Sequence, residues 1–244
     1  MKTTLYFIIL VTSFPSFAKL FAKKSLGYFE LQLQGETYAI SAVKTSRLKT
    51  IEAVGMVPRG AAVLTPAGAL KNQGIQHIIH VAPGAMTETG KNFNPTLKGL
   101  RTSILNALEL STKKGLPCLA VPFIGGGIFL HAFKMTKEDL ARDILRTFQK
   151  LSSLQKIVFV TWGQEDTEVF KKVMAELRPG DRFSLAPGSS TDHKTHKCET
   201  IVNAANMEVR FGGGISGVIG NATEMSEAID AGTRELIQKY YLQK

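Results

Sequence analysis

Two glycine-rich loops hold the residues best suited to chemistry, and each loop follows an apolar run. The loops contain Gly125, Gly126 and Gly127 in the middle of the chain and Gly212, Gly213, Gly214 and Gly217 near its end. Glycine lets the backbone approach a ligand because no Cβ stands in the way, and a helix that follows such a loop adds its positive dipole end. One triplet marks an ordinary turn about as often as a phosphate site, but two triplets after buried-type strands predict a diphosphate site.

Polar side chains stand near both loops. Asn203 and Asn206 flank two alanines before the second loop, and a carboxamide can donate and accept hydrogen bonds at the same time. His131, just beyond the first loop, is a candidate acid or base, although its interpretation as an ordinary loop residue is favoured. His193 and His196 lack a cysteine or carboxylate cluster at ligand spacing, so we predict a solvated linker there and no metal site.

Strands and helices alternate along the chain and must position these loops. Strands are expected at 28–33, 38–43, 61–64, 75–81, 116–123, 156–161 and 200–203, and helices at 95–115, 136–151, 165–177 and after 217. This alternation predicts a three-layer α/β/α domain, with 116–123 as a central parallel strand because its apolar run is almost unbroken. The polar, turn-rich stretch 178–200 is predicted to be a linker that could include one short strand at 183–186.

The first residues have the order of a secretory signal. Lys2 precedes an apolar run from Leu5 to Val11, and the small-residue site Ser16-Phe17-Ala18 follows. A membrane anchor is the alternative, but it needs about 20 apolar residues. We therefore expect a cleaved signal over 1–18, a single domain over 19–244, a secreted or periplasmic location, and no membrane contact after cleavage.

Charge and cysteine content limit the partners. The formal net charge of the chain is +10, and removal of 1–18 takes away only Lys2, which leaves +9 and favours anionic partners. The basic residues are scattered pairs without interleaved aromatics, so the pattern does not favour nucleic acid. With two cysteines in the chain, a cysteine-only zinc site is excluded.

Together these runs resemble the macro domain, the fold that binds ADP-ribose. The resemblance rests on Ile201–Asn206 with the glycines after it, on Pro122–Phe129, and on the strand-like runs Ala62–Gly68 and His77–Val81. It covers most of 28–177 and of 198–241, but in the reverse of the family's order, which implies a three-layer mixed sheet that is circularly permuted with 178–200 as the joining linker. A worn first copy joined to a truncated second copy is the alternative. The run Gly217–Thr223 resembles viral-type members most.

The resemblance assigns roles to individual residues. Asn206 would hold the hydroxyls of the distal ribose and is the catalytic candidate, and Trp162 would stack on adenine. Glu36 would read the adenine amino group, with Asp181 as the alternative. The other residues expected to contact the ligand are Ile201, Asn203, Ala204, Ala205, Gly212, Gly213, Gly214, Ile215, Gly217, Ile124, Gly125, Gly126, Gly127, Ile128 and Phe129.

The implied partner is ADP-ribose or an ADP-ribosylated protein, with no cofactor. Many hydrolytic members carry an aspartate two residues after the last glycine of the triplet, where this chain has Ser216. A water held by the ligand's own phosphate could then attack the anomeric carbon while Asn206 fixes the ribose. We therefore expect a hydrolase that removes ADP-ribose from modified proteins or cleaves a related ester, with a non-catalytic reader module, also a candidate secreted effector, as the alternative. A decayed scaffold is the third interpretation.

Two further expectations depend on the strand pairing that the family fold implies. Cys118 and Cys198 would lie at similar depth on neighbouring parallel strands, so we hypothesise that they form a disulfide in an oxidising compartment. Buried free cysteines are the alternative. His80 is expected to be structural.

Overall fold

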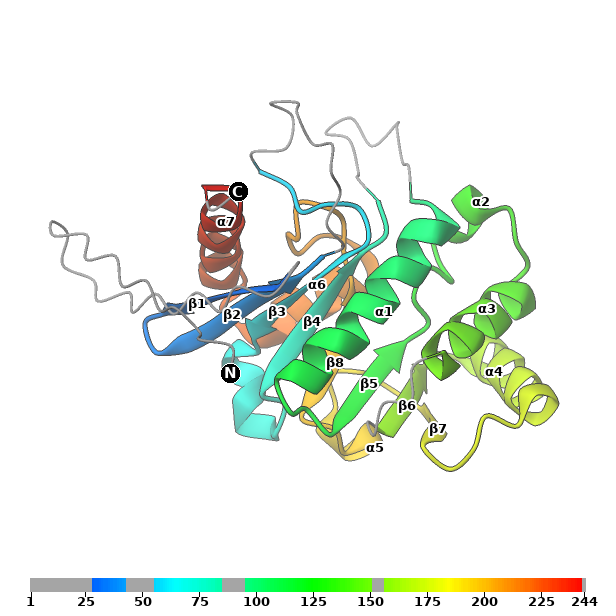
Figure 1. The fold of residues 1–244 in the computed structure, drawn as a ribbon. Helices are drawn as coiled ribbons and strands as arrows, with labels where there is room; N and C mark the ends of the chain where they lie inside the picture. Colours follow the sequence, from blue (N-terminus) through cyan, green and yellow to red (C-terminus); the bar gives the residue numbers. More distant parts are fainter. Residues whose placement is uncertain (1–27, 43–54, 85–94, 151–155, 243–244) are drawn as a thin grey trace, which may run out of the picture.

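The protein forms one eight-stranded mixed sheet with helices on both faces (Figure 1). The structure is a computed structural model, and it describes residues 28–42, 55–84, 95–150 and 156–242. The strands are β1 (Tyr28–Leu33), β2 (Glu36–Ser41), β3 (Ala61–Pro66), β4 (His77–Ala82), β5 (Cys118–Pro122), β6 (Lys156–Thr161), β7 (Phe183–Pro187) and β8 (Thr200–Ala204). Their order across the sheet is β1-β2-β3-β4-β8-β5-β6-β7, with β1 to β4 antiparallel and β4 to β7 parallel. The predicted three-layer fold class is confirmed.

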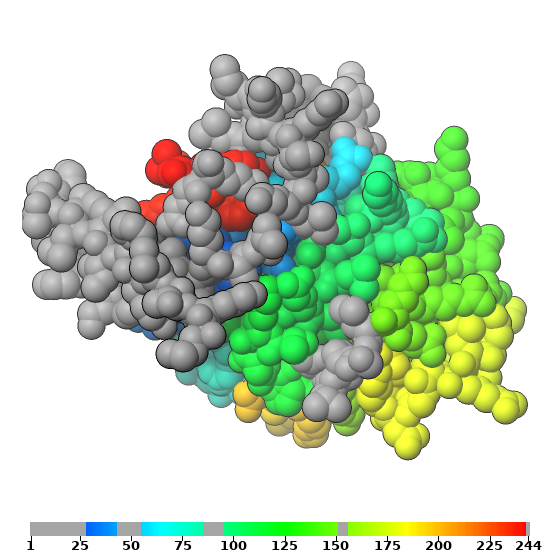
Figure 2. Space-filling view, viewed as in Figure 1, coloured from blue at the N-terminus to red at the C-terminus, as the bar shows by residue number. Residues whose placement is uncertain are grey.

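Helices cover the two faces of the sheet unequally. One face carries α1 (Leu97–Lys113), α3 (Lys137–Gln149) and α4 (Gln164–Leu177), and the other carries α6 (Gly214–Thr223) and α7 (Ser226–Leu242). In Figure 2 the helices α1 and α3, in green, cover much of the visible face. Along β3 the side chains alternate between the layers, because Ala62 and Leu64 join the cluster with α1 whereas Ala61 and Val63 join the cluster with α7. Each face of the sheet is therefore part of the core.

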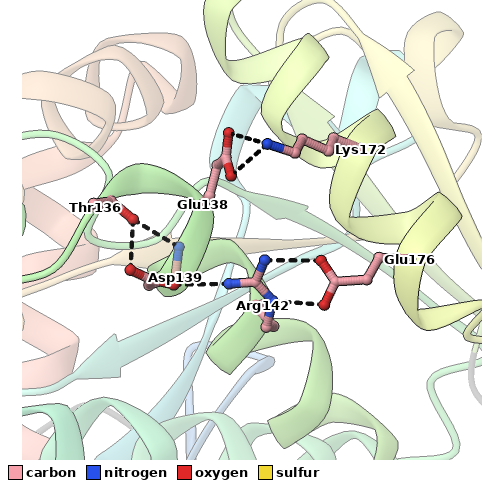
Figure 3. A network of polar contacts seen from close by, with 6 residues as sticks. All are labelled: Thr136, Glu138, Asp139, Arg142, Lys172 and Glu176. Carbon is pink, nitrogen blue, oxygen red and sulfur yellow. Dashed lines mark hydrogen bonds and ion pairs between the residues drawn. The ribbon is translucent and has the colours of Figure 1, made fainter.

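Helices α3 and α4 are joined by ion pairs on their exposed sides (Figure 3). Arg142 contacts Glu176 through two hydrogen bonds of 2.8 Å, and Lys172 contacts Glu138 at 2.8 Å. Thr136 caps the N-terminus of α3, as the sequence pattern predicts. Because exposed ion pairs contribute little to stability, burial of the apolar stripe of α3 does more to hold this layer on the sheet.

The segment near the C-terminus supplies the middle of the sheet. Strand β8 lies between β4 and β5 and runs parallel to both, with Ile78 beside Ile201 and Ala120 beside Ile201. Cys118 and Cys198 form a disulfide with a Cα–Cα distance of 5.0 Å, which confirms the hypothesis from the sequence. The bond joins the start of β5 to the residues before β8, so the late strand is tied covalently to the centre of the fold.

Several boundaries differ from the predictions. The stretch 178–200 is not merely a connection, because β7 pairs with β6 along five residues and the short helix α5 (His193–His196) follows. The expected final helix is two helices, and the first begins at Gly214, so Gly217 lies inside α6.

The predicted signal peptide lies outside the described residues. Within the described part of the chain, no helix is long and apolar enough to cross a bilayer.

Candidate functional site

The candidate site lies at the carboxyl edge of the parallel strands. Because β8, β5, β6 and β7 run in the same direction, the segments that follow them emerge at one edge of the sheet. These segments are the second glycine loop after β8, the first glycine loop after β5, Trp162 after β6 and Gly188 after β7. The fold therefore brings to one edge loops that are up to about a third of the chain apart in sequence.

The second loop leads directly into the N-terminus of α6. Gly213 is the N-cap and Gly214 has a positive φ of +60°, so the first turn of α6 carries no side-chain cap from its N-cap residue. A Cβ added at Gly212, Gly213 or Gly214 would meet nothing within 4 Å. Internal packing therefore does not require glycine at these three positions. Open backbone at the positive end of a ten-residue helix is suited to an anion.

Gly217 has a different role in the same loop. A Cβ at this position would clash with the carbonyl oxygen of Gly212. Gly217 is thus required for the loop to fold back onto the first turn of α6, whereas the triplet faces outward. The sequence pattern alone does not separate these two uses of glycine.

The first loop also has a packed side and an open side. Gly125 has a φ of +83°, and a Cβ there would meet the ring of Phe133, while a Cβ at Gly126 would meet the ring of Phe123. Gly127 faces open space. The side chain of Ile128, which follows, is 72% exposed. The loop therefore presents an apolar side chain and one open glycine at its surface.

A buried polar network lies beneath the second loop. The Asn203 amide nitrogen lies 3.0 Å from His80 Nδ1 and 3.2 Å from Ser216 Oγ. His80 Nε2 lies 2.9 Å from Thr65 Oγ1, and the backbone N–H of Gly212 donates to Ser216 Oγ at 3.4 Å. Burial lowers the pKa of His80 to about 3, so the ring is neutral. This network connects strand β3 to the glycine loop.

Asn206 has an acceptor without a partner. The residue is half-buried, and its Oδ1 is fully buried and makes no hydrogen bond to the described atoms. A buried carbonyl oxygen without a donor is costly, and such groups are rare in native structures. The Asn206 backbone carbonyl accepts from the N–H of Val209 at 3.1 Å, which fixes the backbone around this side chain. An oxygen in this state is suited to a hydroxyl of a bound ligand.

A hollow of about 650 Å³ continues the site beside β6 and β7. Trp162, whose side chain is 77% exposed, lines it together with Thr161, Thr167, Pro187 and Gly188. The N–H of Gly188 donates to the carbonyl of Thr161 at 2.9 Å and holds the two strand ends together. An exposed indole over a hollow of this size can stack on a planar ring.

Comparison with known proteins identifies the fold family. The sequence model of the Macro domain matches residues 38–138. A macro domain-containing protein of Caldanaerobacter subterraneus is 32% identical over 134 residues, which are 53% of this chain and 71% of that protein. This chain belongs to the macro domain family.

Other relatives match a similar share of this chain. A protein of Pyrobaculum aerophilum is 31% identical over 130 residues, and an O-acetyl-ADP-ribose deacetylase of Citrobacter rodentium is 25% identical over 122 residues. These matches cover 53% and 50% of this chain and 66% of each relative, so the chain spans about two thirds of the length of such relatives. The family match ends at residue 138, and the second glycine loop of this macro domain lies beyond it.

Several residues that the sequence predicts as ligand contacts belong to the core of this macro domain instead. The side chains of Ile201 and Ile124 are completely buried in the core clusters. Ala205 is 2% exposed, and its N–H donates to Val81 at 2.9 Å. Asn203 is fully buried, its amide nitrogen is engaged in the network described above, and its Oδ1 has no partner among the described atoms. The predicted ligand contacts at these residues are therefore not contacts of exposed side chains, because the side chains are buried in the core.

The remaining predicted contacts lie at the carboxyl edge. Ala204 and Ile215 are half-buried and pack against the core, whereas Gly127, Ile128 and the triplet Gly212–Gly214 face outward. Phe129 is half-buried, and its ring centroid lies 6.4 Å from that of Phe133. His131 lies in the short helix α2 (Leu130–Phe133) and is exposed. These positions agree with a ligand that passes over the two loops.

The predicted acidic residue is in the wrong place. Glu36 follows the β1–β2 turn and forms an ion pair with Lys71, which lies in the helix η2 (Gly68–Gln73) between β3 and β4. Because β4 begins where β3 ends, this pair lies at the amino edge of the parallel strands, opposite the loops. Asp181 lies before β7 and is at the amino edge too. Both assignments are corrected by strand direction.

The residues at the end of β7 are the part of the site that the sequence reasoning missed. Ser189 and Thr191 follow Gly188 beside the hollow, and their hydroxyl oxygens are 2.8 Å apart. The hydroxyl of Ser190 is buried and makes no hydrogen bond to the described atoms. The sequence allows a short strand at 183–186, which corresponds to β7. Pairing of that strand with β6 places these hydroxyls near Trp162.

Proposed function

We propose that this protein binds ADP-ribose at the carboxyl edge of its parallel strands. The observation that carries the proposal is the outward-facing triplet Gly212–Gly214 at the start of α6, on the same edge as the unpartnered oxygen of Asn206. The diphosphate would lie between the two glycine loops, the distal ribose at Asn206, and the adenine on Trp162. Membership of the macro domain family supports this assignment.

We further propose that the protein hydrolyses ADP-ribose from modified proteins or cleaves a related ADP-ribose ester. Relatives named O-acetyl-ADP-ribose deacetylase support an ester-type reaction. Ser216 holds Gly212 and Asn203 and is only 6% exposed, so it does not offer a base to the ligand. The chain's own contribution would be orientation, since Asn206 fixes the ribose while a water on the ligand's phosphate attacks.

A non-catalytic reader is the second candidate function. The inward position of the Ser216 hydroxyl favours it, because Ser216 then does not activate a water at the ligand. A reader would bind ADP-ribose as tightly as a hydrolase does, so affinity alone does not separate the two. Turnover does.

Calorimetry with ADP-ribose tests the binding site. We expect Asn206→Ala to weaken binding at least tenfold, because the ribose hydroxyls lose their partner. Glu36→Gln is the matched control, since it changes a carboxylate at the opposite edge and should leave the affinity unchanged. No heat with the unmodified protein at millimolar ligand would refute the proposed function.

Release of ADP-ribose tests the reaction. The unmodified protein and Asn206→Ala would be incubated with a protein carrying ester-linked ADP-ribose and, separately, with O-acetyl-ADP-ribose. We expect release by the unmodified protein and at least a tenfold loss in the variant. Binding without release from either substrate would assign the reader function.

We also propose that the chain is exported and that its macro domain is circularly permuted. The disulfide supports an oxidising compartment, because such bonds are rare in reducing cytosol. The insertion of β8 between β4 and β5, with the family match confined to residues 38–138, supports the permutation. Mass determination of the exported chain should give an N-terminus near Lys19. A relinked chain that begins with β7 and β8 and continues through α7 into β1 should fold and bind ADP-ribose.

A further inference from the structure

His80 contacts the second glycine loop in two independent ways, although it lies in the middle of the sheet. Its side chain is fully buried on β4. Through Asn203 and Ser216 it connects to the backbone N–H of Gly212. Its ring also packs against Phe211, with a distance of 5.3 Å between ring centroids. Phe211, which precedes the triplet, and the N–H of Gly212 are thus both linked to the imidazole of His80.

The hydrogen bonds of the network define which atoms donate. The Asn203 amide has two N–H groups, and one is directed to His80 Nδ1 and the other to Ser216 Oγ. His80 Nδ1 is therefore the acceptor, and the proton of the neutral ring is on Nε2, which donates to Thr65 Oγ1. With this tautomer the orientation of the Asn203 amide is fixed, because turning it over would place an oxygen against the lone pair of Nδ1.

Ser216 transmits this orientation to the loop. Its oxygen accepts from Asn203 and from the N–H of Gly212, so the hydroxyl is held inside the fold. Without the Asn203 N–H, Ser216 Oγ would keep the N–H of Gly212 as its remaining donor among the described residues. In the described structure a Cβ built at Gly212, Gly213 or Gly214 would meet nothing within 4 Å, so no neighbouring atom packs against the open face of the triplet on that side.

We propose that His80 is a positioning residue for the anion loop: as an acceptor at Nδ1 it fixes Asn203, which fixes Ser216, which sets the position of Gly212 at the start of α6. This inference rests on the proposed function, since the loop is positioned for the diphosphate of ADP-ribose. The imidazole does not touch the ligand and acts only through its neighbours.

Two amide substitutions separate the two ring nitrogens. In His80→Asn, the side-chain oxygen takes the place of Nδ1 and can still accept from Asn203. In His80→Gln, the longer side chain reaches the position of Nε2 and Thr65 but leaves Asn203 without its acceptor. Both variants replace a ring with a primary amide in the same buried place, so each controls for the stability cost of the other.

The first measurement is the amide NMR signal of Gly212 in the ligand-free protein. We expect the signal to stay near its original position in His80→Asn and to shift in His80→Gln. Ser216→Ala cuts the network at its other end and leaves His80 intact, so it should shift the same signal even if a His80 variant fails to fold. An unchanged Gly212 signal in His80→Gln or in Ser216→Ala would overturn the proposal.

The second measurement is the affinity for ADP-ribose. We expect a loss of less than threefold in His80→Asn and of tenfold or more in His80→Gln, with no further loss when His80→Gln is added to Ser216→Ala. Equal losses in the two His80 variants, or losses that multiply in the double variant, would refute the positioning role. If the unmodified protein does not bind ADP-ribose, the proposed function fails, and the Gly212 signal alone decides whether His80 positions the loop.

Discussion

His80 should make the stability of this macro domain depend on pH, and its replacement should remove that dependence. Burial lowers the pKa of the folded-state imidazole to about 3, whereas a histidine in an unfolded chain has a pKa of about 6.5. Below pH 6.5 the unfolded state therefore binds a proton that the folded state does not bind. The free energy of unfolding must fall as the pH falls through this range.

The expected loss between pH 8 and pH 5 is about 2 kcal/mol. Each pH unit below the unfolded-state pKa removes about 1.4 kcal/mol, and pH 5 lies about 1.5 units below that pKa. The loss in the free energy of unfolding does not depend on the exact folded-state pKa of His80, as long as that pKa stays well below 5. A fully buried ring without a negatively charged partner among its contacts, which are Thr65, Asn203 and Phe211, meets this condition.

Urea unfolding of the unmodified protein and His80→Asn at pH 8, 7, 6 and 5 measures this loss. Burial also lowers the pKa of His77 and His196, but both residues are present in the two proteins and cancel in the difference. At pH 8 we expect the unmodified protein to be the more stable, and its advantage should shrink by about 2 kcal/mol at pH 5. A constant difference across the four pH values would show that His80 binds its proton equally well in the folded and unfolded states and would refute the reasoning.

Three other changes test separate parts of the structure. Gly217→Ala should weaken ADP-ribose binding at least tenfold in calorimetry, because the added Cβ meets the carbonyl of Gly212 and such overpacking costs about 1–3 kcal/mol; unchanged affinity would contradict the described loop. Burial raises the pKa of Asp230, so its charged form is disfavoured in the folded state; Asp230→Asn should raise the melting temperature slightly at pH 8 and not at pH 3, where both side chains are neutral. Reduction of the disulfide, which spans 80 residues, should lower the free energy of unfolding by about 4 kcal/mol in urea, and an equal midpoint with and without reductant would oppose a stabilising role.

Periodicity and apolar runs in the sequence predict most elements of this fold, because those signals are local. The hairpin at 28–41, the buried strand β5 and the capped helix α3 all occur where expected. The edge strand β7 was harder to recognise, since it lies in a polar, turn-rich stretch and only its pairing with β6 makes it a strand. An edge strand with one covered side needs few apolar residues, so its composition resembles that of a linker.

The candidate site could be predicted only where it depends on single loops. The outward triplet and Asn206 follow from the local pattern, whereas the failure at Glu36 is a matter of strand direction. The tripeptide at the β1–β2 turn resembles a ligand-binding turn, but the register with β3 places it at the amino edge. Likewise, the sequence cannot show that Asn203 is buried with its amide nitrogen bonded to His80 and Ser216 while Asn206 is only half-buried, because contacts with β4 and α6 make this difference.

The position of a strand in the sheet, and not its place in the chain, decides what it contributes to this site. Strand β8 comes last among the described strands, yet its carboxyl end lies between those of β4 and β5, and the second glycine loop and α6 follow it. The network from Thr65 to Gly212 crosses β3, β4 and β8 and so requires all three strands in this order. A disulfide between β5 and the residues before β8 holds the late strand in its central position. We therefore expect a relinked chain to keep the second glycine loop, provided that β8 still enters between β4 and β5.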